Sequence, residues 1–428
     1  MSTEHRLTEL ASGVRVVTEA MPSVRSVSLG VWIGTGSVDE SEAQAGLSHL
    51  LEHLLFKGSE RYGSQEIDEL FDAMGAELNA GTGKEATSVY ARVLDDHLER
   101  ALDVMGEMVF RPALRDVDSE REVILEEIAM YEDDPQDKVF DLLGRAVFGS
   151  HPLGRAIIGR AEVVAGTPVE QIAAFHSARY RSENVVVAAA GSLEHDELVA
   201  LVESRVPDRA ETRAAQAGEE PPLELARRTC FERKDTEQYH VCLGAPGLAR
   251  DDERRYALRV LDTIFGGTSS SRLFQEIREQ RGLAYAVYSF SSHHARTGQV
   301  GIYLGTRGEN LASACEVTAR ELEKLRDAPA TSEELARAKE NLKGRMVLSL
   351  ESTAARMNRL GSSVLANLPL LSIEETIARV DAVEIDDLAA LARELFAPER
   401  LSIAGIGPDS ELFDAALGSL APAVAEPA

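Results

Sequence analysis

Hydrophobic and polar residues follow two different periods along the first part of the chain. Runs rich in β-branched residues at 14–18 and 26–33 predict strands, joined by a turn at 21–23. Between Leu47 and Phe56 no Gly or Pro interrupts the chain, and leucines recur at helical spacing. A second helix is predicted over 64–74, with Ser64 as its N-cap and Gly75 at its end.

The same hydrophobic periodicity predicts the elements that follow, up to about residue 207. It predicts an extended pair at 77–82 and 86–93, helices at 95–110 and 117–132, and a strand at 184–191 followed by a helix. The segment 208–226 is charged, rich in alanine and ends in prolines, which is typical of a linker. Residues 421–428 are predicted to be a disordered tail.

The sequence after this linker repeats the sequence before it. Residues 54–59 match 263–268, and 66–70 match 276–280, at a spacing of about 210 residues. Each half also ends in a strand, a Gly turn and a helix. We therefore predict an α+β fold of two homologous α+β domains, each a mixed β-sheet packed against helices. The predicted ranges are 1–207 for the N-terminal domain, 208–226 for the linker and 227–420 for the C-terminal domain.

Composition restricts the class of protein. The chain has 428 residues and a formal net charge of -27, which disfavours nucleic acid and anionic membranes as partners. No apolar run reaches the roughly 20 residues that cross a bilayer. The N-terminus has neither signal-peptide nor transit-peptide character, and three cysteines without metal-type spacing suit a reducing compartment. We therefore expect a soluble cytoplasmic protein.

The helix at 47–56 carries the first candidate chemistry. His49 and His53 are four residues apart and point the same way, with Glu52 beside them. Two imidazoles in this arrangement can bind one zinc ion, and the neighbouring carboxylate can act on a metal-bound water. The alternative is a buried helix with two histidines that hydrogen-bond elsewhere.

In the second half, the positions equivalent to the motif residues fall on Leu258, Leu261 and Asp262. These residues lack the donor set for zinc. The second half is therefore predicted not to bind the metal.

Zinc held by two histidines needs a third protein ligand. As a helix, 119–131 has an apolar face through Val123, Ile124, Ile128 and Tyr131, and Glu127 lies on that face. Glu120 lies on the same stripe, whereas Glu122 and Glu126 point to solvent. We predict Glu127 as the third ligand and Glu120 as a supporting residue beside the ligand set. The alternative is that Glu127 pairs with a buried arginine.

The pattern His49-x-x-Glu52-His53, followed by Glu120-Arg121-x-Val123-Ile124-x-Glu126-Glu127-Ile128, resembles the pitrilysin/insulinase family of zinc peptidases (peptidase M16, the inverzincins). The duplicated layout resembles its short-chain branch, which is related to mitochondrial processing peptidase, over nearly the whole chain. The resemblance implies that His49, His53 and Glu127 bind one zinc ion per chain. It also implies that Glu52 is the general base on a zinc-bound water.

The resemblance extends to substrate binding. Asn79-Ala80-x-Thr82, with Tyr90 following, matches the family strand to which the substrate adds as an extra strand. Arg278 and Tyr285, seven residues apart, match the pair that binds the substrate backbone. From the residues alone they suggest donors to a carbonyl or oxyanion, and a surface arginine with a core tyrosine is the alternative.

The glycine-rich stretch at 266–271 invites comparison with a phosphate-binding loop. It lacks the Gly-Lys-Ser/Thr ending of that motif. We therefore predict a hinge or a substrate-contact turn between two helices.

These implications converge on a zinc metalloendopeptidase or oligopeptidase, of bacterial origin, that hydrolyses peptides in a chamber. The chamber would be formed by a homodimer in which Arg278 and Tyr285 act in trans. Two alternatives stay open. One is the catalytic subunit of a heterodimeric processing peptidase that needs a metal-free partner, and the other is a non-catalytic structural homologue.

Overall fold

The computed structural model describes residues 5–206, 223 and 226–420 of the chain. The predicted tail at 421–428 lies outside the described residues, as does the predicted linker at 208–226 apart from two positions.

The described residues form two compact units, and neither is continuous in sequence. The first unit holds 5–129, 155–206 and 347–372, and the second holds 130–154, 223, 226–346 and 373–420. These ranges differ from the contiguous domains predicted from the sequence, because each unit includes one segment from the other half of the chain.

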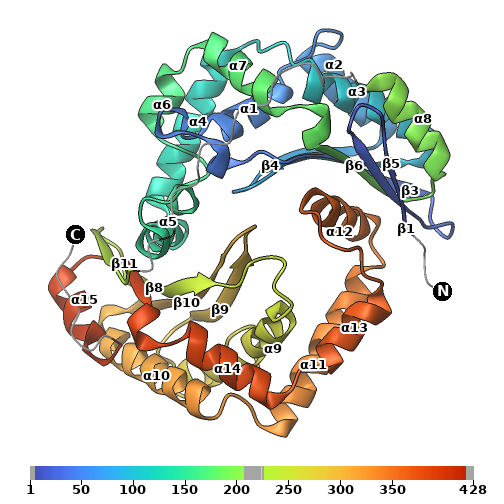
Figure 1. Cartoon of the computed structure of the whole chain (residues 1–428). Helices are drawn as coiled ribbons and strands as arrows, with labels where there is room; N and C mark the ends of the chain where they lie inside the picture. Colours follow the sequence, from blue (N-terminus) through green and yellow to red (C-terminus); the bar gives the residue numbers. More distant parts are fainter. Residues whose placement is uncertain (1–4, 207–222, 224–225, 421–428) are drawn as a thin grey trace. The chain divides into compact units, whose positions relative to one another are not determined.

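The first unit is built on a mixed sheet with the strand order β1-β2-β6-β3-β5-β4 (Figure 1). Its strands are β1 (His5–Glu9), β2 (Arg15–Ala20), β3 (Ser26–Ile33), β4 (Glu77–Thr82), β5 (Thr87–Leu94) and β6 (Val185–Gly191). β2 and β6 run parallel, and the other neighbours are antiparallel. In this order β4 is an edge strand of the sheet.

The second unit repeats this topology without a counterpart of β1. Its strand order is β7-β11-β8-β10-β9, with β7 and β11 parallel and the other neighbours antiparallel. The strands are β7 (Thr229–Arg233), β8 (Gln238–Gly247), β9 (Ala286–His293), β10 (Gly298–Arg307) and β11 (Ser402–Gly407). The predicted fold class, two homologous α+β domains with mixed sheets, is confirmed.

One face of the first sheet packs against helices from the same half of the chain. These are α1 (Leu47–Leu55), α2 (Ser64–Met74), α3 (Leu98–Phe110), α4 (Val117–Asp133), α6 (Ala161–Gly166), α7 (Val169–Arg179) and α8 (His195–Arg205). Alternate residues of β3, such as Val27 and Leu29, are buried in this core together with the leucines of α1. The predicted cap of α2 is wrong: Gly63 is the N-cap, and the Ser64 hydroxyl instead donates to the Phe56 carbonyl at 2.9 Å.

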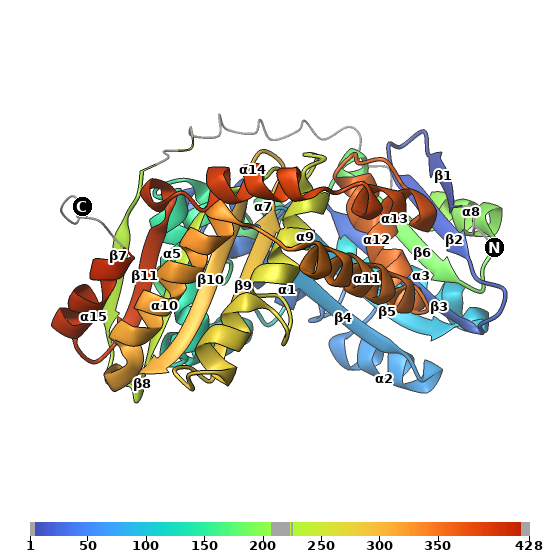
Figure 2. The ribbon, with the colours of Figure 1, turned by 90° about the horizontal axis from the view of Figure 1, so that it is seen from below.

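The opposite face of the first sheet is covered by α12 (Thr353–Leu365), a helix from the second half of the chain (Figures 1 and 2). Met357 and Leu360 of α12 pack in one buried cluster with Val17 of β2 and Val186 of β6. Buried Glu19 is held by Arg356 and Arg359 of the same helix.

The second unit shows the reciprocal arrangement. Its helices are α5 (Pro135–Phe148), α9 (Arg255–Phe265), α10 (Gly308–Asp327), α11 (Ser332–Ser349), α13 (Ile373–Asp381), α14 (Ile385–Leu395) and α15 (Ser410–Ala416), with a π-helical turn η6 (Phe274–Glu279). α5 belongs to the first half of the sequence, yet its Ala146 carbonyl accepts a 3.1 Å hydrogen bond from Ser402 of β11. Phe140 of α5 also stacks on Tyr303 of β10.

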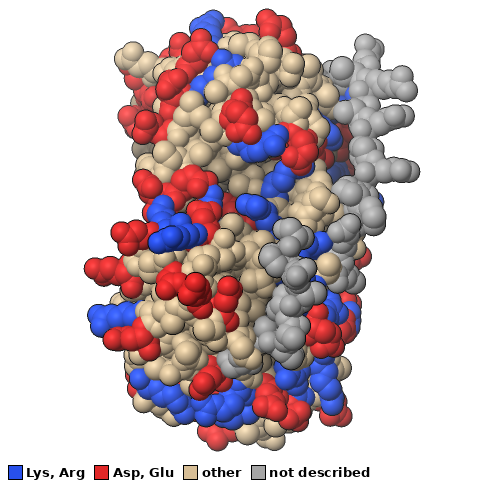
Figure 3. Space-filling model, turned by 90° about the vertical axis from the view of Figure 1, so that its left-hand side faces the viewer, with Lys and Arg blue, Asp and Glu red and all other residues tan. Residues whose placement is uncertain are grey.

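Charged side chains of both signs lie beside one another on the face drawn in Figure 3. Ion pairs between described residues include Arg155 with Glu42 and Arg254 with Glu394. None of the described helices has the length and apolar composition needed to cross a membrane. The cytoplasmic location stays a prediction.

Candidate metal centre

The helix that carries the histidines is held by packing along one face and by hydrogen bonds at its N-terminus. The leucines of α1 are fully buried, which fixes the rotation of the helix. Its N-cap is Gly46, in the left-handed conformation at φ 103°, so no side chain at this position caps the helix. The buried carboxylate of Glu40 takes over this role by accepting hydrogen bonds from the amides of Gly46 at 2.9 Å and Ser48 at 2.6 Å.

The three predicted ligands lie together. Glu127 Oε2 is 3.8 Å from His49 Nε2 and 3.6 Å from His53 Nε2. One donor atom from each residue lies within 4.8 Å of the others, and no other such group occurs in the part of the chain that the structure describes. Among the described residues, Glu127 lies within ion-pair distance of the two histidines, and not of a buried arginine as in the alternative interpretation.

The helix α4 presents Glu127 differently from the prediction. Val123 and Tyr131, expected on the buried face, are 43% and 48% exposed, whereas Ile124 is fully buried. The packed face runs instead through Val117, Glu120 and Ile124. Glu127 follows Glu120 and Ile124 on this side of the helix, two turns and one turn further along, and its carboxylate lies beside the two histidines.

Glu120 lies beside His53. Its Oε2 lies 3.2 Å from His53 Nδ1, and its side chain is only 5% exposed. This contact assigns the ring proton to Nδ1 and leaves Nε2, the atom that faces Glu127, free to bind a metal. His49 Nδ1 is buried and has no hydrogen-bond partner among the described residues.

The donor set fits zinc. Two imidazole nitrogens and one carboxylate oxygen form a three-ligand set of the kind that catalytic zinc sites use. Burial, together with the neighbouring His53, lowers the pKa of His49 to about 4. Its imidazole is therefore neutral at neutral pH and needs to lose no proton before it binds a metal.

Glu52 lies beside this cluster and is held from another element. Its Oε2 accepts a 2.5 Å hydrogen bond from the hydroxyl of Thr82, the last residue of β4. Burial raises the pKa of Glu52, and the hydrogen bond from Thr82 opposes this rise. The sequence pattern around Thr82 predicts no role for this residue. Its contact with Glu52 arises because β4 ends next to α1.

The predicted substrate residues of β4 and β5 divide between the two faces of the sheet. Asn79 is exposed and pairs in register with Tyr90, which packs against the cluster under α12. Ala80 packs on the opposite face, against the core that includes α1. Asn79 and Ala80 thus lie on an edge strand that ends at the metal-centre helix.

Arg278 and Tyr285 belong to the second unit and contact each other there. The guanidinium carbon of Arg278 lies 4.7 Å from the ring centres of both Tyr285 and Phe274. Tyr285 is 76% exposed, so it is not the core tyrosine of the alternative interpretation.

Among the described residues, the equivalent helix of the second unit, α9, has no group of metal-binding side chains. Leu258 and Leu261 of α9 are buried, and Asp262 accepts a 2.5 Å hydrogen bond from Ser289. The glycine-rich turn that follows α9 packs closely on this helix and on β9: a Cβ on Gly266 would lie 2.2 Å from the Ser289 amide nitrogen. This close packing accounts for the glycine at position 266, so a phosphate-binding role is not needed to explain it.

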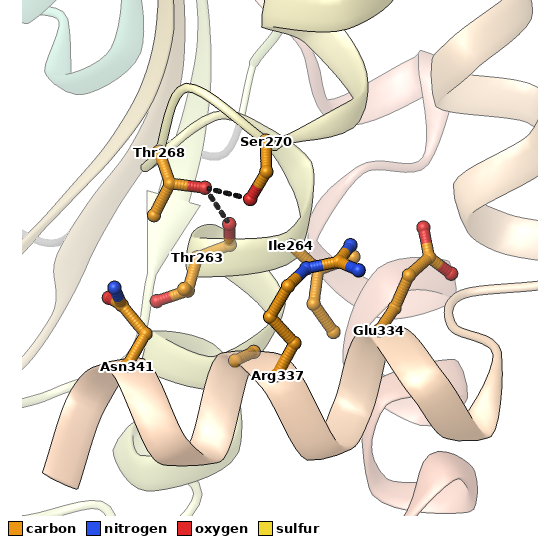
Figure 4. A pocket seen from close by; sticks show the side chains of 8 residues that line it. Thr263, Ile264, Thr268, Ser270, Glu334, Arg337 and Asn341 are labelled. Atoms are coloured by element: carbon orange, nitrogen blue, oxygen red, sulfur yellow. Dashed lines mark hydrogen bonds between the residues drawn. The ribbon is translucent and has the colours of Figure 1, made fainter. Parts of the chain in front are cut away.

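A small pocket lies between this turn and α11 (Figure 4). Its lining includes Thr268 and Ser270 from the turn and Arg337 and Asn341 from α11. The Thr268 hydroxyl donates to the Thr263 carbonyl of α9 at 3.4 Å and lies 3.3 Å from the Ser270 hydroxyl of the turn.

Comparison with known proteins agrees with this arrangement. A family model described as Insulinase (Peptidase family M16) matches residues 15–161, and one described as Peptidase M16 inactive domain matches 168–342. An uncharacterized zinc protease of Streptomyces coelicolor is 43% identical, with 94% of this chain and 89% of the relative covered. One of Bacillus subtilis is 40% identical, with 94% of this chain and 98% of the relative covered.

Solved structures show the same fold. A protease from Helicobacter pylori superposes with a TM-score of 0.87 at 22% identity, over 95% of this chain and all (100%) of the other. An M16 inactive domain from Pseudomonas fluorescens gives a TM-score of 0.87 at 24% identity, over 95% of this chain and 98% of the other. The family models and the relatives that are 40% and 43% identical confirm the predicted family: the chain belongs to the insulinase family of peptidases, family M16.

Proposed function

We propose that this protein is a zinc-dependent endopeptidase or oligopeptidase. The observation that carries the proposal is the convergence of His49, His53 and Glu127, with the carboxylate of Glu52 beside them. Membership of a peptidase family and the zinc proteases among the relatives support it.

The chemistry divides between the metal and the chain. His49, His53 and Glu127 would hold one zinc ion, which when bound polarises the scissile carbonyl and lowers the pKa of a water. Glu52 takes a proton from the attacking water and later delivers it to the nitrogen of the leaving amine. Because the Thr82 hydroxyl holds Oε2 of Glu52, we assign the proton transfer to Oε1.

Substrate binding is proposed at two places. The exposed edge of β4 accepts a peptide as an additional strand, since an edge strand offers unpaired backbone groups. Arg278 and Tyr285 donate to the substrate backbone, and the exposure of Tyr285 leaves its hydroxyl accessible. We propose that they act in trans within a homodimer whose chamber favours short or unfolded peptides.

Cleavage of a fluorogenic peptide by wild type and Glu52→Gln, with zinc quantified in both, tests the catalytic proposal. We expect about one zinc per chain in both proteins and cleavage by wild type alone. Absence of zinc from both would refute the proposal, whereas zinc without cleavage would favour a subunit that needs a metal-free partner.

Mixing two inactive variants tests the action in trans. In a homodimer, a Glu52→Gln chain paired with a Tyr285→Phe chain contains one site with both residues intact. We expect the mixture to recover up to about a quarter of the wild-type rate if chains pair at random. Failure to recover activity, although light scattering shows a dimer, would place both residues in the same chain.

A further inference from the structure

The carboxylate of Glu120, which accepts the hydrogen bond from His53 Nδ1, is itself held by a residue outside the motif. Lys57 Nζ lies 2.7 Å from Glu120 Oε1, while Glu120 Oε2 faces His53 Nδ1 at 3.2 Å. The three side chains therefore form a continuous chain in which each oxygen of Glu120 has one partner.

Burial makes this arrangement necessary. The Glu120 side chain is 5% exposed, and a buried carboxylate needs a counter-charge and filled hydrogen-bond positions. Among the described residues, Lys57 is the lysine or arginine within ion-pair distance of Glu120, and its own side chain is 32% exposed. The ammonium thus reaches inward from the protein surface to Glu120.

The backbone of Lys57 is fixed in place. Its amide donates to the Leu54 carbonyl at 3.2 Å, directly after the last turn of α1. The next residue, Gly58, has φ 105°, and its carbonyl accepts a 2.9 Å hydrogen bond from the Ala113 amide. These hydrogen bonds hold the backbone of Lys57 beside the end of the helix that carries the two histidines.

We propose that Lys57 is a positioning residue of the metal centre. It orients Glu120, and Glu120 in turn orients the imidazole of His53 with Nε2 toward Glu127. The inference rests on the proposed function, since it assigns His53 as a zinc ligand. His49 has no equivalent support at Nδ1 among the described residues, so His53 is the ligand whose orientation the protein sets in advance.

The direction in which zinc affinity changes when Lys57 is replaced distinguishes a positioning role from a purely electrostatic one. A lysine near a divalent cation repels it, so a purely electrostatic role predicts tighter zinc binding when Lys57 is removed. A positioning role predicts weaker binding, because Glu120 would lose the partner that holds it. Changes at partners of metal-binding histidines typically weaken metal binding by about 10- to 100-fold.

Competition with a chromophoric chelator measures zinc affinity in the full-length chain. We expect Lys57→Met to bind zinc about 10- to 100-fold more weakly, and Lys57→Arg to recover most of the loss. Lys324→Met is the matched control, because Lys324 also lies 2.7 Å from a buried glutamate, Glu321, in the second unit. It should bind zinc like wild type.

Coupling to Glu120 completes the test. The double variant Lys57→Met/Glu120→Gln should bind zinc no more weakly than Glu120→Gln alone, because Lys57 acts through Glu120. Thermal unfolding of the metal-free proteins verifies that each variant folds. If wild type binds zinc and Lys57→Met binds it equally or more tightly, this inference alone is overturned. Losses of zinc affinity that add in the double variant would also overturn it. Wild type that binds no zinc would overturn the proposed function as well.

Discussion

Thr82 and Glu52 join the edge strand of the first sheet to the metal-centre helix. The Thr82 hydroxyl at the end of β4 donates to Glu52 Oε2 at 2.5 Å. The strand proposed to receive the substrate and the carboxylate proposed as general base are therefore connected directly.

Removal of this hydroxyl should impair the chemical step. We expect Thr82→Val to lower kcat about tenfold or more, because Glu52 loses the contact that fixes its orientation. KM and zinc content should stay near wild type, and Thr82→Ser should retain most of the activity. Steady-state kinetics with one fluorogenic peptide measures these quantities, and a change confined to KM would argue against the role.

Glu127 should control zinc binding without controlling the fold. Its side chain is 34% exposed, so we expect replacement by the similarly sized glutamine to leave no buried cavity. We expect Glu127→Gln to weaken zinc binding by more than about 100-fold, the upper range for residues that only support a ligand. Glu126→Gln, an exposed neighbour on the same helix, is the control. Equal zinc affinity in the two variants would remove Glu127 from the ligand set.

The packing of α12 on the first sheet predicts opposite effects for two helical glycines. A Cβ on Gly361 would lie 2.2 Å from the indole nitrogen of Trp32, whereas a Cβ on Gly344 of α11 would meet nothing within 4 Å. We expect Gly361→Ala to lower the free energy of unfolding by about 1–3 kcal/mol through overpacking. Gly344→Ala should raise it by up to about 1 kcal/mol through helix propensity. Calorimetric unfolding temperatures measure both, and equal shifts would contradict the packing.

The ion pair between Arg272 and Glu334 predicts a pH-dependent contribution to stability. Arg272 donates two 2.8 Å hydrogen bonds to this carboxylate and lowers the pKa of Glu334 from 4.5 to about 2. Since the folded-state pKa is depressed, the contribution is complete above about pH 4.5 and disappears as the pH falls toward about 2.

The corresponding variant is Glu334→Gln. At neutral pH we expect it to lower the free energy of unfolding by about 1–3 kcal/mol, with the difference from wild type shrinking below about pH 4.5. Glu333→Gln, at an exposed neighbouring position, is the control. Thermal unfolding measured across this pH range checks the trend, and a constant difference down to about pH 3 would contradict it.

The sequence predicted those features that depend on short-range periodicity. The bounds of α2 agree with the expected 64–74, and β3 agrees with 26–33, because each carries a clear helical or strand pattern between turn residues. The duplication was also visible, since equal spacings in two halves of a chain reflect equal topology. The pairing of His49 with His53 follows from the helix alone.

Contacts between distant segments were decided by the tertiary structure. The exposure of Val123 and Tyr131 could not be read from the apolar spacing of α4, because a helix pattern identifies a stripe but not the neighbour that covers it. Thr82, Lys57 and Glu40 carry no pattern of their own, and they acquire partners only where a strand end, a turn and a loop meet the metal-centre helix.

The sequence by itself determined the local elements, the duplication and the chemical identity of the candidate ligands, since these depend on residue types at short or regular spacing. Only the tertiary structure brought Glu127 to the two histidines and Lys57 to Glu120, and only it placed α12 and α5 on the sheets of the opposite halves. The physical reason is that burial of a sheet face selects the helix whose shape and charge match it, whatever its distance along the chain.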